Sequence, residues 1–149
     1  MKNKGCIILV IFLIILVTYI LFQRYSPKIP SPVVLQIKNR LTHIDPSFSK
    51  IPIYIDDSAY TIDKRTIYLC LRDSETGEIF DINTLMYVTL HEIAHVITHD
   101  SEYNINGKLD DHGPLFRKNF SRLLTIATSK GVYDPRKPLP KSYCGAHRI

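Results

Sequence analysis

The chain has few cysteines, no internal repeat and no low-complexity tract. Its three cysteines, Cys6, Cys70 and Cys144, are too few for the disulfide framework of a small secreted domain. Because Cys6 lies in a long apolar segment, a single bridge between Cys70 and Cys144 is the most that the chain allows. We expect reduced thiols, so the cysteines do not identify the compartment. At 149 residues, the chain has room for one modest domain but not comfortably for two.

Acidic residues are scarce in the C-terminal part of the chain. From Gly113 onward, eight lysines and arginines stand against one acid, Asp134, and the whole chain has a formal net charge of +5. A basic segment of this kind can contact nucleic acid or anionic lipid headgroups. A solvated surface is the commoner explanation of such charge. Nucleic acid therefore stays open as a partner without further support from the sequence.

An apolar run occupies residues 6–22 and reads CIILVIFLIILVTYILF. As a helix it reaches roughly 26 Å, which is close to the thickness of a bilayer's hydrocarbon core. The alternative is a cleaved signal peptide, but the exit sequence TYILFQRYSPK lacks a cleavage site flanked by small residues. The sequence predicts a single-pass transmembrane helix within an N-terminal membrane anchor, residues 1–25. Positive charge flanks both ends, so the side of the membrane on which the rest of the chain lies is undetermined.

The rest of the chain is typical of one α+β domain. Residues 26–32 form a Pro/Ser linker, and the domain follows at 33–149. The segment DSETGE at 73–78 has the composition of a turn. Hydrophobic spacing and residue preference predict strands at 51–55 and 65–72, and helices at 33–44, at 82–99 and from Pro114 to just before Gly131. Asp81 or Asn83 is expected to cap the 82–99 helix.

The 82–99 helix contains the sequence His-Glu-Ile-Ala-His at residues 91–95. At about 100° per residue, His95 lies only about 40° around the helix from His91. The two imidazoles therefore share one face, with Glu92 beside them. The apolar stripe that would face a core lies elsewhere on the helix and consists of Met86, Leu90, Ile93, Ala94 and Ile97.

Two histidines spaced four residues apart on a helix can each give one ring nitrogen to Zn²⁺. Bound zinc lowers the pKa of a water molecule toward about 7, and an adjacent carboxylate can then accept its proton. Glu92 is placed to serve as that general base without being a ligand. The pattern HExxH therefore indicates a single zinc ion in a hydrolase that cleaves peptide bonds.

A third ligand has to come from outside this helical turn. His99 lies a further turn along the helix, too far from an ion held between His91 and His95, and we expect it to be a helix-terminal histidine. The sequence VITHDS lacks the glycine and histidine of the metzincin form, and Glu102 is the only later glutamate. His112 is favoured because it ends a polar loop and opens the next helix. The open set comprises His112, Asp110, Asp111, Asp134, Cys144 and His147.

The pair HExxH and HGPLF (112–116) resembles the SprT/Spartan family of zinc metallopeptidases and the related WLM-like proteins, which also occur in large DNA viruses. The stretch TIYLCLRDSETGEIFDINTLMYVTLHEIAH is similar to the viral WLM-like proteins. The resemblance covers about residues 50–125. It implies a zincin-like domain in which a short β-sheet packs on the active-site helix. It also implies His91, His95 and His112 as zinc ligands, Glu92 as catalytic base, and Phe116 as an aromatic behind the third ligand.

These features predict a membrane-anchored zinc metallopeptidase acting on polypeptides. The strand TIYLCLR is a candidate for pairing with an extended substrate, and Tyr133, Tyr143 and His147 are candidate oxyanion donors. One alternative is a non-catalytic zinc-stabilised binding module, closed by a fourth ligand such as Asp110 or Cys144. Another is a DNA–protein crosslink protease that uses the basic C-terminal part.

Overall fold

A computed structural model describes residues 3–25, 31–98, 103 and 106–144. The chain divides into two compact units, Met1–Pro30 and Ser31–Ile149. The described residues form four α-helices, one short 3₁₀ helix and three strands, so the predicted α+β class is correct.

The first unit contains helix α1, Asn3–Tyr25. A helix that crosses a bilayer has to be both long enough and apolar enough to match the hydrocarbon core. Among the residues that the structure describes, no helix meets both conditions. The predicted transmembrane helix at residues 6–22 is therefore wrong, and so is the membrane location that followed from it.

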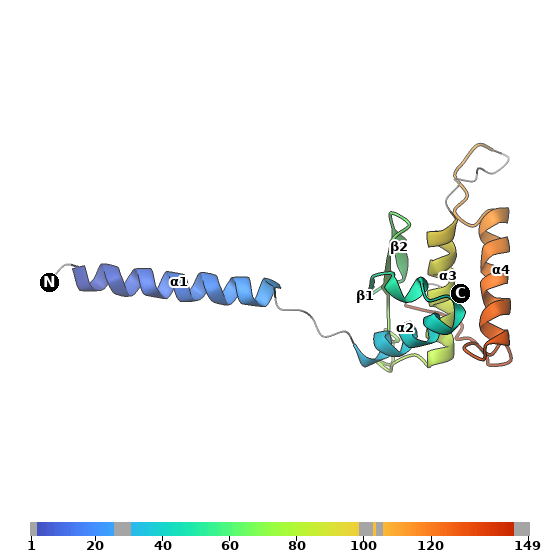
Figure 1. Cartoon of the computed structure of the whole chain (residues 1–149), viewed down its shortest axis with the longest axis horizontal. Helices are drawn as coiled ribbons and strands as arrows, with labels where there is room; N and C mark the ends of the chain where they lie inside the picture. Colours follow the sequence, from blue (N-terminus) through green and yellow to red (C-terminus); the bar gives the residue numbers. More distant parts are fainter. Residues whose placement is uncertain (1–2, 26–30, 99–102, 104–105, 145–149) are drawn as a thin grey trace. The chain divides into compact units, whose positions relative to one another are not determined.

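Helix α3, Ile82–Ile97, is the central element of the second unit. Its first turn is capped by Asp81, whose carboxylate accepts hydrogen bonds from the backbone amides of Asn83 and Thr84. Helix α4, Pro114–Ser129, packs along one side of α3, and the small sheet lies on the other, as Figure 1 shows. Helix α2, Pro32–Ile44, also packs on α3. The large apolar side chains that are fully buried here are Ile37, Leu41, Ile67, Leu69, Leu85, Met86, Leu90 and Ile93.

The sheet has the strand order β1-β3-β2, formed by Ile53–Ile55, Thr66–Leu69 and Tyr60–Ile62 respectively. Strand β3 runs parallel to β1 and antiparallel to β2. Since β3 has a partner on each side, the prediction that TIYLCLR pairs with a substrate is wrong. The edge strand that packs on α3 is β2, a strand that the hydrophobic pattern of the sequence does not predict.

A tight turn joins β2 to β3. Asp63 and Lys64 both have positive φ angles, 52° and 53°, and the backbone amide of Arg65 donates to the carbonyl of Ile62 at 3.0 Å. Two left-handed residues in succession are typical of a type I′ hairpin turn. The ammonium group of Lys64 donates to the carbonyl of Thr98 at 2.7 Å. This contact holds the hairpin against the C-terminal end of α3.

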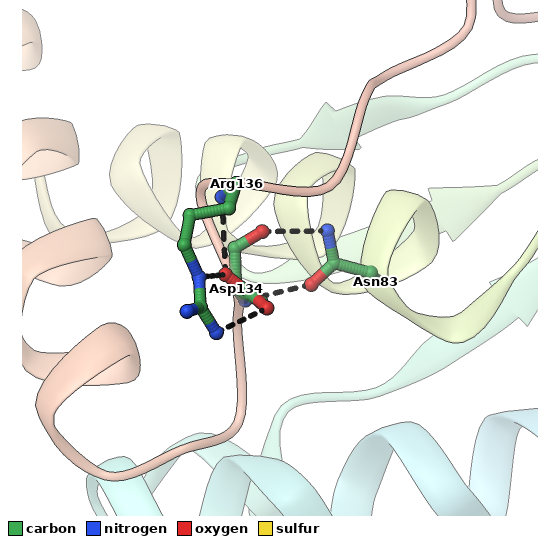
Figure 2. Close-up of polar contacts among 3 residues, drawn as sticks. All are labelled: Asn83, Asp134 and Arg136. Carbon is green, nitrogen blue, oxygen red and sulfur yellow. Dashed lines mark hydrogen bonds and ion pairs between the residues drawn. The ribbon is translucent and has the colours of Figure 1, made fainter.

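The segment after α4 has no regular secondary structure as far as residue 144, as expected, but it is firmly attached to the domain. The buried amide of Asn83 donates to the carbonyl of Asp134 at 3.1 Å and accepts from its backbone amide at 2.7 Å (Figure 2). Arg136 forms an ion pair with the Asp134 carboxylate at 3.0 Å. Cys70 and Cys144 form a disulfide, so the expectation of reduced thiols is wrong.

Candidate metal centre

The structure brings His91, His95 and His112 together into one cluster. Each offers a ring nitrogen, and these nitrogens all lie within 4.8 Å of one another. The ring centroids form a nearly equilateral triangle, with separations of 5.0 Å for His91–His95, 5.0 Å for His91–His112 and 4.9 Å for His95–His112. The three imidazoles therefore converge on one point from three directions.

Two short segments place these rings. His91 and His95 lie one turn apart on α3, as the i, i+4 spacing predicts. His112 lies in the loop just before α4, where its backbone amide donates to the Asp110 carboxylate at 3.2 Å. The next residue, Gly113, is buried, and its amide donates to the carbonyl of Asp110 at 3.2 Å. This turn carries His112 back to α3.

Phe116 supports all three histidines from behind. Its ring centroid lies 4.9 Å from that of His91, 4.4 Å from His95 and 4.7 Å from His112. The side chain is only 3% exposed. Aromatic rings at these separations pack favourably and restrict each other's orientation. The predicted position of Phe116, behind the third histidine, is confirmed, and the structure extends its contact to the other two.

The geometry of the histidines fits a tetrahedral divalent ion. The Nε2 atoms of His91 and His112 are 3.1 Å apart. Two nitrogens that each lie about 2.0–2.1 Å from one tetrahedral ion are separated by roughly 3.3–3.4 Å. The distance therefore needs only a small adjustment. Within the described residues, no carboxylate or thiolate joins the three histidines in this cluster.

Burial keeps the helix histidines in the state that a metal requires. It lowers the pKa of both His91 and His95 from 6.5 to about 4, and repulsion from neighbouring histidines adds to the effect. The charge of Asp111 acts in the opposite direction on His95. A metal binds the neutral imidazole, so these groups do not have to lose a proton near neutral pH before binding.

Glu92 lies beside the cluster and is only 5% exposed. Burial raises the pKa of its carboxyl group from 4.5 to about 7, and a hydrogen bond from Thr61 partly opposes this. The Thr61 hydroxyl donates to Oε2 of Glu92 at 2.8 Å. A carboxyl group with a pKa near neutrality can both accept and release a proton at physiological pH.

A cavity of about 520 Å³ opens in front of these groups. Strand β2 and the turn that follows it form one wall, and the turn before α4 forms another. The lining residues are Ala59, Tyr60, Thr61, Asp63, Lys64, His91, Glu92, His95, Asp111 and His112. The predicted metal ligands and the predicted base thus face the same space.

The other predicted candidates do not join the histidine cluster or lie outside the described residues. Asp134 is bound to Asn83 and Arg136, and Cys144 is in a disulfide. Asp111 lines the cavity without joining the histidine cluster. Two candidate oxyanion donors, Tyr133 and Tyr143, are buried and do not line the cavity. His99 and His147 fall outside the described residues.

Comparison with known proteins relates the chain to viral proteins of unassigned function. It is similar to uncharacterized proteins of Invertebrate iridescent virus 3 (40% identity over 97 residues, 65% of this chain and 55% of that protein) and Invertebrate iridescent virus 6 (37% over 98 residues, 64% and 50%). It is also similar to an uncharacterized protein of Acanthamoeba polyphaga mimivirus (35% over 132 residues, 83% and 56%). The chain therefore spans about half the length of these curated relatives. No protein-family model matches it, and no solved structure matches it significantly.

Proposed function

We propose that this protein is a zinc-dependent metallopeptidase, with His91, His95 and His112 as metal ligands and Glu92 as general base. The observation that carries the proposal is the convergence of three histidines beside a buried glutamate in one open cavity. The similarity of its two motifs to SprT-like and WLM-like peptidases supports the same reading.

The ligand set favours a catalytic over a purely structural zinc site. Structural zinc sites are closed by four protein ligands, whereas catalytic sites keep one position open. Here Cys144 is held in a disulfide, and no carboxylate within the described residues joins the histidine cluster. A bound ion would supply a Lewis acid at the open position and lower the pKa of water there.

Glu92 would then move protons during hydrolysis. Its carboxylate accepts the proton of the attacking water and passes it to the nitrogen of the leaving amine. The cost of burying the negative charge keeps the pKa of Glu92 close to 7, so neither transfer is strongly uphill. A structural zinc site would have no use for a base in this position.

Strand β2 offers a backbone surface for an extended polypeptide. The backbone amide of Ile67 donates to the carbonyl of Pro52, so the backbone groups of Ile67 face β1. The neighbouring residues of β3, Thr66 and Tyr68, therefore direct their backbone groups toward β2. Their partners on β2 are Ile62 and Tyr60. The backbone amide and carbonyl of Thr61 then point to the edge of the sheet that no described strand pairs with. An added strand at this edge would lie beside the cavity wall, which makes a peptide a suitable substrate.

The test is cleavage of a complex peptide mixture by the full-length protein loaded with zinc, with products identified by mass spectrometry. We expect new cleavage products that disappear on treatment with a zinc chelator and return when zinc is added. Glu92→Gln should reduce the rate by about 10²–10⁴-fold while leaving one zinc per chain. Zinc binding without any Glu92-dependent cleavage would contradict the proposal and favour the non-catalytic binding module.

A further inference from the structure

Thr61 connects the edge strand to Glu92. It lies in the middle of β2, opposite Ile67 of β3, and its side chain is on the face of the sheet that packs on α3. Its hydroxyl group lies 2.8 Å from Oε2 of Glu92 and 3.2 Å from the backbone carbonyl oxygen of the same residue. One hydroxyl therefore contacts Glu92 at both its side chain and its main chain.

This contact restricts the glutamate side chain. The last torsion of a glutamate is broad, so the plane of its carboxylate is set mainly by hydrogen bonds. Among the described residues, Thr61 is the hydrogen-bond partner of Oε2, and no protein group bonds to Oε1. With Oε2 held, Oε1 is the oxygen left to exchange a proton in the cavity.

The position of Thr61 also relates the base to the substrate edge. Its backbone amide and carbonyl face the unpaired side of β2, while its side chain reaches in the perpendicular direction to Glu92. A peptide that pairs with β2 would form hydrogen bonds to the very residue that holds the carboxylate. Docking of the peptide and orientation of the Glu92 carboxylate then both depend on Thr61.

We propose that Thr61 is a positioning residue that fixes the carboxylate of Glu92 for proton transfer beside an edge strand that receives the peptide. This inference rests on the proposed function, because a base has to be oriented only if the site is catalytic. Small misplacements of a reacting group reduce rates by as much as about 100-fold, which sets the scale of the expected effect.

Three variants of the full-length protein test this role. Thr61→Val keeps the shape of the side chain and removes the hydroxyl, whereas Thr61→Ser keeps the hydroxyl. Thr66→Val is the matched control, because Thr66 lies on the neighbouring strand β3 and points to the opposite face of the sheet. Circular dichroism and cobalt content show first whether each variant folds and holds a metal.

The first readout does not require turnover. Acetohydroxamic acid gives up a proton when it binds a metal, and a well-placed carboxylate can accept it. We expect cobalt-loaded Thr61→Val to bind this probe about 10-fold more weakly by visible absorption, with Thr61→Ser and Thr66→Val close to the parent. With a peptide cleaved by the parent protein, kcat should fall by about 10- to 100-fold in Thr61→Val while KM stays within about twofold.

The outcomes separate the two proposals. Normal cobalt content with unchanged probe affinity and unchanged kcat in Thr61→Val would overturn the positioning role alone. Thr61→Ser as impaired as Thr61→Val would also overturn it, since the hydroxyl would not be the active feature. Failure of the parent protein to bind cobalt would overturn the proposed function and this inference together.

Discussion

The two halves of α3 differ in what their polar side chains do. In the N-terminal half, Asn83, Thr84 and Thr89 are buried and hydrogen-bonded within the protein. In the C-terminal half, His91 and Glu92 are held where burial opposes their charged forms. In the first half, Asn83 connects the helix to the segment after α4, and the second half keeps reactive groups at a cavity. One helix thus combines a stabilising segment with a segment that is costly to bury.

The largest effect should follow from removing a ligand at the reactive end. His112→Ala takes away one of three convergent nitrogens, and we expect zinc affinity to fall by more than about 100-fold. His43→Ala is the control, because His43 is an exposed histidine on α2 that lies outside the cluster. Competition with a chromogenic zinc chelator measures both. Equal affinity in the two variants would show that His112 does not bind the metal.

Removing the negative charge of Glu92, in the same half of α3, should stabilise the metal-free protein. The folded-state pKa of Glu92 is raised from 4.5 to about 7, so ionisation costs stability as pH rises through this interval. Glu92→Gln cannot ionise. Its advantage over the parent should be near zero at about pH 4.5 and reach about 3 kcal/mol above pH 7. Urea unfolding across this range measures it, and a gain independent of pH would refute the assignment.

The histidines should have the opposite pH dependence. Their folded-state pKa values are lowered from 6.5 to about 4, so the unfolded chain binds more protons between these values. Their contribution to stability is lost as pH falls through this window and is fully present above about 6.5. In Glu92→Gln, where the opposing carboxyl is absent, the stability of the metal-free protein should rise more steeply with pH than in the parent.

At the other end of α3, a substitution should cost stability and leave the metal site intact. Asn83→Ala leaves the backbone amide and carbonyl of Asp134 without their partner, at a position that is only partly buried. An unpaired group costs about 1–3 kcal/mol when it is fully buried. We expect a loss of about 2 kcal/mol in the free energy of unfolding with zinc affinity unchanged. A large loss of zinc affinity together with unchanged stability would contradict the division between the two halves.

The smallest effect is expected for Thr89→Val. The Thr89 hydroxyl is buried and donates to the carbonyl of Leu85 at 2.7 Å, within its own helix. Because that carbonyl already serves the helix, the loss should cost less than about 1 kcal/mol and should not change cleavage. This contrasts with the same substitution at Thr61. If Thr89→Val and Thr61→Val reduced kcat to a similar extent, the loss of activity in Thr61→Val would not result from its contact with Glu92.

The sequence was sufficient for features that depend on local spacing. The i, i+4 histidines and the helix start at Pro114 follow from helix geometry and residue preference. Residue preference narrowed the cap to Asp81 or Asn83, and the structure shows that it is Asp81. The choice of His112 as third member of the cluster followed from its place at the end of a polar loop. Its convergence with His91 and His95 needed the packing of α4 on α3, which the sequence suggested through the helix that His112 opens and through family resemblance.

Features that depend on distant pairing were missed. Strand β2 is three residues long and ends at a turn of Asp63 and Lys64, so it lacks the length and glycine signals of a hairpin. Without β2, neither the true sheet edge nor the contact of Thr61 with Glu92 could be found. The disulfide joins residues separated by 74 positions, and composition alone does not reveal that distance in space. The apolar run at 6–22 suggested a membrane span that the structure does not support.

The open three-histidine site is best tested by X-ray absorption at the zinc edge of the zinc-loaded protein. We expect three imidazole nitrogens and one oxygen around the ion, with one imidazole lost in His112→Ala. Sulfur in the first coordination shell, or an unchanged set of imidazoles in His112→Ala, would contradict an open three-histidine site at the end of α3.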